Sequence, residues 1–386
     1  MTIRALTSIK DIPATTWDAL WSDYPFTRHA FLLALEESAA TTEESGWQVS
    51  HVIYEHKGEV LAALPLYLKT HSWGEYVFDW AWADAFQAHG LPYYPKLLAA
   101  IPFTPATGPR IGLKKGLDNS ATVVESLLRY CIDMKHWENA SSFHLLFPER
   151  HIRFHDLPLI ERQGYQFHWF NQGYRHFDEF LENFSSRKRK NIKKERARAH
   201  AHGLTFVTQR GDQLSADDWN QFFLFYHTTY LKRSGRYGYL NKNFFQNLGK
   251  TMGDALFVVS AKKGDTPIAM SLFFEDKDTL YGRYWGCSEE LDCLHFELCY
   301  YQGIDYAINE GLQRFDSGAQ GEHKIQRGFI PVLTRSFHHL RHEEFQLAIA
   351  QFCRQEKAHL AHYIDEARQA LPFKEGVELV DSRILL

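Results

Sequence analysis

The sequence has 386 residues, of which 45% are hydrophobic, 15% are aromatic and 23% are charged. This composition excludes a largely disordered chain. The length exceeds the size at which one hydrophobic core usually stops growing, so we expect two domains of roughly 190 residues. A formal net charge of −4 excludes a general affinity for nucleic acids or membranes, although a local cluster of charge still matters.

The cysteines and the N-terminal segment predict the compartment. Five cysteines form no CxxC motif and no regular framework, which is typical of a reducing compartment. The first residues, MTIRALTSIKDIP, lack the apolar centre of a signal peptide, and no window approaches 18 consecutive apolar residues. We therefore expect a cytoplasmic protein without an integral membrane segment.

The first half of the chain predicts a mixed sheet flanked by helices. A helical stretch at Thr16 to Ala40 is followed by two strands within His51 to Lys69, joined by a Lys-Gly turn. An aromatic-rich insertion then covers residues 76–105. A strand, an amphipathic helix and a buried strand follow it, at Thr107 to Leu113, Ala121 to Lys135 and Phe143 to Phe147.

The junction between the halves holds the densest charge in the chain. In SSRKRKNIKKERARAHAHG, eight of the twelve residues from Arg187 to Arg198 are basic. A serine can cap this segment and Gly203 can close it, so we expect a helix. Its basic face is interpreted either as a solvated linker or as a surface for the phosphates of RNA, a nucleotide or a lipid-linked precursor, with Lys190 and Lys194 as candidate contacts.

The second half repeats the pattern of the first. Helical stretches at Ala216 to Gly235 and Asn241 to Met252 precede a hairpin at Leu256 to Asp276. A strand, a helix and a buried strand follow, at Thr279 to Gly286, Leu294 to Glu310 and Arg314 to Ser317. The fold class is therefore α+β in two copies. The expected bounds are 1–172 for the first domain, 173–203 for the linker helix and 204–386 for the second domain.

Reactive side chains gather in the loop after the last of these strands. Gly321 is followed by Glu322, His323 and Lys324, at the carboxyl end of a strand, where binding loops are usually set. An imidazole suits a general base for an amine, and a lysine suits a carbonyl or phosphate oxygen. The alternative is three solvated loop residues, because adjacent side chains in a loop point in different directions.

The strand and helix before this loop offer further candidates. Strand alternation places Arg283 and Trp285 on one face of the strand and Tyr284 on the other. Because Tyr284 lies near the end of this strand, its hydroxyl could protonate a leaving group. His295 and Glu297 on the helix are interpreted as hydrogen-bonding groups that shape the site. Zinc needs more ligands than His295 and Cys299 provide, so no metal is expected.

The insertion of the first half is interpreted as a substrate wall or as a lid that only packs. It combines aromatic, acidic and basic residues, and His168 near the junction is expected to line a cleft. The candidate substrate contacts of this region are Trp80, Asp84, Tyr93, Tyr94, Lys96, Arg110 and His168.

The two-copy pattern with a basic helix between the copies resembles the Fem-type aminoacyltransferases, which are built from two GNAT acyltransferase domains. Several runs are more specifically similar to the bacterial group described as FemAB-like, or predicted N-acyltransferases, of peptidoglycan biosynthesis or recognition. These runs cover nearly the whole chain; they include FDWAWADAFQAHGLPYYPKLLAAIPFTPATGPRI, FHWFNQGY, SSRKRKNIKKER, GRYWG, LHFELCYY and GAQGEHKIQRGF.

The resemblance implies a donor site and leaves its chemistry open. GNAT enzymes hold the pyrophosphate of acyl-CoA at a glycine-rich helix start. The second copy has the acidic CSEELDCLH there, whereas the first has Lys114, Lys115 and Gly116 before its helix. The long helical arm of Fem proteins that handle tRNA is missing. The donor is therefore expected to be acyl-CoA or an aminoacyl-tRNA, with tRNA as a further partner.

The sequence thus predicts an N-acyltransferase that moves an acyl or aminoacyl group from a thioester or tRNA ester to an amine. A small molecule or muropeptide, such as a peptidoglycan precursor, is the expected acceptor. The alternatives are a protein that binds peptidoglycan fragments without chemistry and an RNA-binding protein that works through the basic helix.

Overall fold

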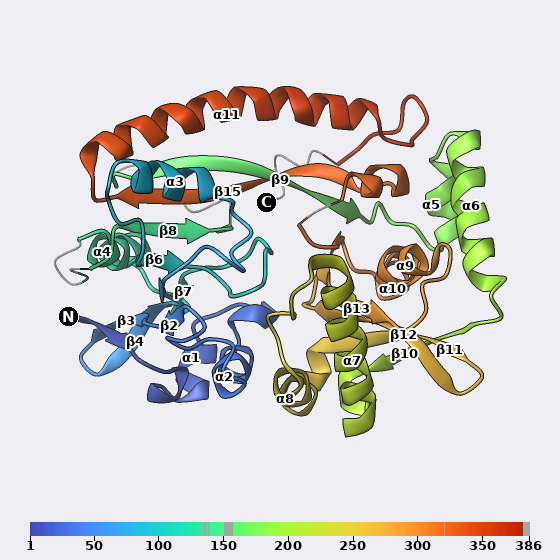
Figure 1. The fold of residues 1–386 in the computed structure, drawn as a ribbon, viewed down its shortest axis with the longest axis horizontal. Helices are drawn as coiled ribbons and strands as arrows, with labels where there is room; N and C mark the ends of the chain where they lie inside the picture. The colour runs from blue at the N-terminus through green and yellow to red at the C-terminus, as the bar shows by residue number, and fades with distance from the viewer. Residues whose placement is uncertain (134–136, 138, 150–156, 320, 381–386) are drawn as a thin grey trace. The chain divides into compact units, whose positions relative to one another are not determined.

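The computed structural model describes residues 1–133, 137, 139–149, 157–319 and 321–380 (Figure 1). The chain forms two compact units. Unit 1 contains Met1–Gly164 and Leu333–His362, and unit 2 contains Tyr165–Val332 and the described residues from Tyr363 onward. Each unit is therefore built from separate stretches of the chain, whereas the predicted bounds of 1–172 and 204–386 divide the sequence only once.

Unit 2 contains a mixed sheet and most of the predicted helices and strands. Its first four strands pair in sequence order as antiparallel neighbours, and the fifth joins the fourth in parallel. The sixth, part of a strand that starts in unit 1, pairs antiparallel with the fifth. In spatial order they are β10 (Thr205–Arg210), β11 (Leu256–Lys263), β12 (Thr266–Glu275), β13 (Thr279–Cys287), β14 (Arg314–Asp316) and β9 (Ile160–Phe170).

Helices cover the sheet of unit 2. They are α5 (Phe177–Glu182), α6 (Ser186–His200), α7 (Ala216–Ser234), α8 (Lys242–Met252), α9 (Leu294–Phe296) and α10 (Gln302–Asn309). A π-helical turn at Glu297–Tyr301 joins α9 to α10. Figure 1 shows α7 lying along this sheet. The contact is close because a Cβ on Gly286 of β13 would lie only 2.1 Å from the backbone carbonyl carbon of Phe225, so a side chain there would push α7 away.

Unit 1 contains a four-stranded antiparallel sheet and part of a second sheet. The first has the order β1 (Thr2–Leu6), β3 (His51–His56), β4 (Glu59–Leu64) and β7 (Gly112–Leu113). The second contains the part of β15 (Ile330–Leu340) that lies in this unit, then β8 (Ser142–Leu146), β6 (Lys96–Ala99), β5 (Tyr67–Lys69) and β2 (Trp47–Val49). The helices are α1 (Ala14–Asp18), α2 (His29–Glu37), α3 (Trp80–Ala88), α4 (Ser120–Ile132) and the first part of α11 (Glu343–Gln369).

The hairpin predictions and the α+β class are confirmed, with local corrections. The stretch expected as a strand at Thr107 to Leu113 forms only β7, since Pro105 and Pro109 supply no backbone N–H for a ladder. The helical stretch from Thr16 to Ala40 is broken near Pro25 into α1 and α2. The last two residues of the helix expected to end at Lys135 lie outside the described residues.

Each unit has its own apolar core. In unit 2 the core lies between β11 to β13 and the helical segment from Leu294, and includes Phe273, Leu298 and Phe315. In unit 1 it lies between β3, β4, β8 and α4, with Leu127 and Phe143 fully buried. Throughout the part of the chain that the structure describes, no helix combines the length and apolar character needed to cross a membrane.

Candidate functional site

The loop after β14 in unit 2 is held from inside by Lys324. Glycines with positive φ, Gly318 at +94° and Gly321 at +116°, let the chain turn sharply before a short 3-10 helix at Glu322–Arg327. The Lys324 side chain is buried, and its Nζ donates hydrogen bonds to the carbonyls of Ser317 at 3.2 Å and Gly318 at 2.7 Å. Burial lowers the pKa of Lys324 to about 7. This lysine therefore positions the loop.

A buried ion pair fixes the start of the same loop. The carboxylate of Asp316, at the end of β14, accepts a hydrogen bond from Arg283 Nη2 at 2.8 Å, and His168 Nε2 lies 3.7 Å away. Burial alone would raise the pKa of Asp316, but the adjacent Arg283 charge and His168 hold that pKa well below its usual range. Burial lowers the pKa of His168 to about 3, so its ring is neutral at pH 7.

His323 is the predicted general base of this loop, and its ring has a polar partner. Its Nε2 lies 2.9 Å from the Tyr300 hydroxyl. Partial burial, together with the charges of Arg327 and Lys324, lowers the pKa of His323 to about 4. The ring is therefore neutral at pH 7 and can accept a proton. The neighbouring Glu322 carboxylate accepts a hydrogen bond from Tyr363 at 2.8 Å, so it has a partner of its own.

A pocket lies beside this histidine in unit 2. The His295 ring centroid is 6.3 Å from that of His323 and 4.6 Å from that of Trp285. Burial lowers the pKa of His295 to about 3. The pocket has a volume of about 170 Å³, and its lining residues are Thr229, Arg233, Trp285, Cys287, Glu289, Glu290, Leu291, Leu294 and His295.

Two other sequence candidates face the core of unit 2 or its basic helix. Tyr284 is buried, with its ring centroid 5.7 Å from that of Tyr226 and 5.8 Å from that of Phe245. Glu297 is fully buried and binds Arg196 of α6 at 2.8 Å, so it anchors that helix. The predicted alternation of Arg283 and Tyr284 on opposite faces of β13 agrees with these contacts.

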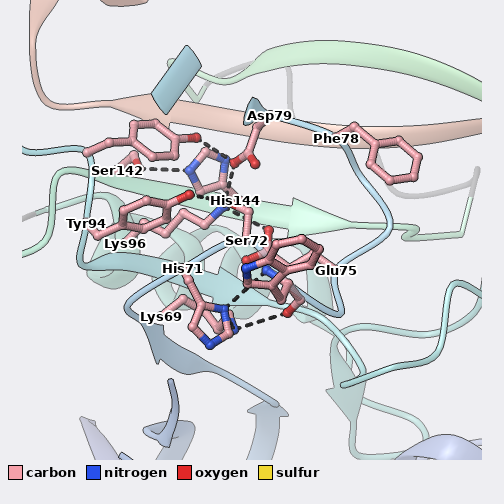
Figure 2. A network of polar contacts seen from close by, with 12 residues as sticks. Lys69, His71, Ser72, Glu75, Phe78, Asp79, Tyr94, Lys96, Ser142 and His144 are labelled. Atoms are coloured by element: carbon pink, nitrogen blue, oxygen red, sulfur yellow. Dashed lines mark hydrogen bonds and ion pairs between the residues drawn. The ribbon is translucent and has the colours of Figure 1, made fainter. Parts of the chain in front are cut away.

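A buried polar network lies within unit 1 (Figure 2). The Lys96 ammonium donates to Ser72 Oγ at 2.8 Å, Glu75 Oε2 at 2.8 Å and Asp79 Oδ2 at 2.5 Å. Tyr93 also donates to Asp79, at 2.6 Å. These charged groups are almost completely buried, and they tie β6, within the inserted segment, to Asp79 near the start of that segment and to Glu75 just before it. The contacts of Lys96 and Tyr93 are therefore internal ones.

Sequence reasoning missed two members of this network, Lys69 and Glu75. Lys69 Nζ lies 3.2 Å from His71 Nδ1 and 3.9 Å from the centroid of the Trp47 ring. Burial lowers the pKa of Lys69 to about 7 and raises that of Glu75 to about 7. No local motif marks either residue. Glu75 meets Lys96 from 21 residues away, and the Trp47 ring that Lys69 contacts lies in β2.

We expect Lys69→Met to remove a pH-dependent gain in stability. The folded pKa of Lys69 lies below its unfolded value, so between pH 7 and 10.5 the unfolded state binds more protons and stability rises with pH, by at most about 1.4 kcal/mol per unit. Urea unfolding at pH 7, 8 and 9 should show this rise in the wild type and in the exposed control Lys115→Met. A parallel rise in Lys69→Met would contradict the assignment.

The remaining candidates of the first half are dispersed. Arg110 is buried and donates to the carbonyls of Leu146 and Ala106. Tyr94 shares a hydrogen bond of 2.8 Å with Ser72. The ring centroid of Trp80 lies 4.8 Å from that of the exposed Trp73, and Asp84 is exposed.

The predicted phosphate contacts lie on exposed surfaces. Lys114 forms an ion pair of 2.5 Å with Glu59, while Lys115 and Gly116 are exposed before α4. On α6, Lys190 and Lys194 are exposed, and neither has an ion pair within the described part of the chain. In that same part, no group of three or more histidine, cysteine or acidic residues could hold a metal ion.

Comparison with family models now adds to this geometry. The model for the FemAB-like family, described as peptidoglycan biosynthesis/recognition, matches residues 8–375. The chain belongs to the FemAB-like family. A search of curated proteins finds no match for this FemAB-like chain.

Solved structures show the fold of this FemAB-like chain. FemX matches at 12% identity and a TM-score of 0.50, covering 91% of this chain and 100% of FemX. L-PGS from Bacillus licheniformis matches at 12% and 0.50, covering 86% and 97%. The C-terminal domain of a putative lysylphosphatidylglycerol synthetase from Agrobacterium fabrum matches at 12% and 0.51, covering 87% and 93%. The predicted α+β fold is confirmed, and these structures share it over most of the chain.

Proposed function

We propose that this FemAB-like protein is an N-acyltransferase that moves an acyl or aminoacyl group to the amine of a cell-envelope precursor. The observation that carries the proposal is the neutral imidazole of His323, which is hydrogen-bonded to Tyr300. Its ring lies near that of His295, which lines a pocket. A neutral imidazole on a glycine loop can take the proton that an attacking amine loses as its nitrogen bonds to the carbonyl carbon. Family membership supports the acceptor class.

In this mechanism the chain's own groups position and deprotonate. Tyr300 orients the His323 ring, and Lys324 fixes the loop that carries it by bonding to two loop carbonyls. The amine nitrogen forms the new amide bond, the thiol or ribose oxygen of the donor leaves, and the proton passes to His323 and then to the leaving group. Orientation of the two reactants supplies a large part of the rate.

A second candidate function is recognition of peptidoglycan fragments without chemistry, which the family description also names. Muropeptide binding that leaves every donor intact would identify this function. RNA binding through α6 is a third candidate, and it would show RNA affinity without any transfer.

We expect the charge of α6 to separate the two donor classes. Purified protein would be incubated with a muropeptide acceptor and either acyl-CoA or aminoacyl-tRNA, and the product detected by mass spectrometry. If tRNA is the donor, reversing Lys190 and Lys194 to glutamate should weaken tRNA binding and reduce its logarithmic salt slope by about two. Reversal of the exposed Lys242 and Lys250 of α8 is the matched control.

The outcomes of this experiment are distinct. Transfer from acyl-CoA that is indifferent to the α6 reversal identifies a thioester donor. Absence of product with every donor, despite muropeptide binding, contradicts the enzymatic proposal and favours the recognition function.

A further inference from the structure

The pocket beside His295 presents both signs of charge around a small volume. It lies where β13 ends and the helical segment from Leu294 begins. Arg233, in the last turn of α7, lines the pocket together with Glu289 and Glu290, in the turn after β13. Each of these charged side chains lines the pocket, so an occupant would meet a guanidinium and carboxylates together.

These charges are available to a ligand. Arg233 is exposed, its guanidinium carbon lies 5.7 Å from the Trp285 ring centroid, and within the described residues it has no ion pair. Glu289 and Glu290 have only long, exposed contacts, at 3.9 Å to Lys263 and 3.7 Å to Lys232. Such exposed pairs contribute little to stability, so exchanging them for a ligand costs little.

The pocket is small and open to solvent. Its volume of about 170 Å³ is below the roughly 300–1,000 Å³ of pockets that enclose a whole small molecule, so it suits one end of a ligand that extends into solvent. The aliphatic side chains of Leu291 and Leu294 supply apolar surface for that end of the ligand.

Alternative occupants leave part of the pocket unsatisfied. A phosphate would face the negative charges of Glu289 and Glu290, which repel it, although the helical segment from Leu294 begins at the pocket. A simple amine would leave Arg233 without an acceptor. A group that carries both an ammonium and a carboxylate satisfies both signs of charge.

We infer that this pocket binds the ammonium and free carboxylate of an amino-acid moiety of the acceptor. The carboxylate binds Arg233 and the ammonium binds Glu289 and Glu290. This inference rests on the proposed transfer function. The moiety is assigned to the acceptor because the carboxyl group of an aminoacyl donor is esterified, so that donor has no free carboxylate. The bound ammonium stays protonated between carboxylates, so the pocket serves recognition while bond formation takes place at His323, whose ring centroid lies 6.3 Å from that of His295.

Binding of small probes to the full-length protein tests the inference without any transfer assay. L-alanine and D-alanine would be titrated by ligand-observed NMR, alongside alanine methyl ester, which lacks the carboxylate, and propionate, which lacks the ammonium. We expect at least one alanine enantiomer to bind at least about tenfold more tightly than the ester and propionate, the loss expected for one charge-assisted hydrogen bond.

Variants assign the charges. Arg233→Gln and Glu290→Gln should each weaken alanine binding at least about tenfold. Arg354→Gln and Glu310→Gln, exposed residues away from the pocket lining, should leave it unchanged. Equal binding of alanine and propionate, no alanine binding, or pyrophosphate binding that depends on Arg233 would overturn the inference. If alanine binding depends on Arg233 and Glu290 but no transfer occurs, the proposed function is rejected and the pocket assignment stands. If transfer occurs but both variants bind alanine as the wild type does, the pocket assignment is rejected and the proposed function stands.

Discussion

Replacing Lys96 by alanine is expected to lower the free energy of unfolding by about 3–5 kcal/mol, the usual effect of removing one partner from a buried ion pair. The Lys96 side chain is fully buried and its ammonium bonds Ser72, Glu75 and Asp79. Without it, two carboxylates remain side by side in the interior. Urea unfolding followed by far-UV circular dichroism measures the change.

Two further variants make this prediction specific. Lys115→Ala removes an exposed lysine of the same unit and should change the free energy of unfolding by less than about 0.5 kcal/mol. In the Lys96→Met background, adding Glu75→Gln and Asp79→Asn removes the stranded charges and should recover part of the loss. A loss below about 1 kcal/mol for Lys96→Ala would show that the network does not hold the insertion in place.

His323→Ala is expected to reduce the turnover number for transfer by about 10² to 10⁴-fold, the range for loss of a general base. Its free energy of unfolding should fall by no more than about 1.5 kcal/mol, because the residue is largely exposed and the substitution removes one hydrogen bond, to Tyr300. Tyr300→Phe should reduce turnover less, since it only frees the orientation of the His323 ring. His359→Ala, an exposed histidine of α11, is the matched control. Unchanged turnover in His323→Ala removes this residue from the mechanism.

The pH profile of the wild type gives an independent check on His323. Burial and the charges of Arg327 and Lys324 lower its pKa to about 4, so the base stays unprotonated down to that pH. Because kcat/KM also reports protonation of the free acceptor amine, the base is read from kcat at saturating acceptor. There the acid limb should lie near pH 4, whereas an ordinary histidine would give a limb near pH 6.5. A limb near pH 6.5 would point to another base.

The sequence predicted the helices and strands better than the contacts between them. The hairpins were predictable because Gly58 and Gly264 mark their turns between apolar runs, and the basic helix because its serine and Gly203 bound it. The loop with His323 was predictable from its glycines at a strand end. These signals are local in the chain.

Long-range partners had no such signal. Glu297 meets Arg196 from 101 residues away, and Lys96 meets Glu75 from 21 residues away, with α3 between them in the chain. The sequence also could not show that the Lys324 side chain turns inward to the carbonyls of its own loop. Side chains of adjacent loop residues point in different directions, and the sequence pattern does not reveal which one points inward.

The split composition of unit 1 has a consequence for synthesis on the ribosome. Its β8 pairs with Ser336–Leu340 of β15, and its polypeptide is completed only by Leu333–His362. Translation delivers all of Tyr165–Val332 before that last portion emerges. Unit 1 must therefore wait, with one edge of β8 unpaired by β15, until Leu333–His362 has left the exit tunnel.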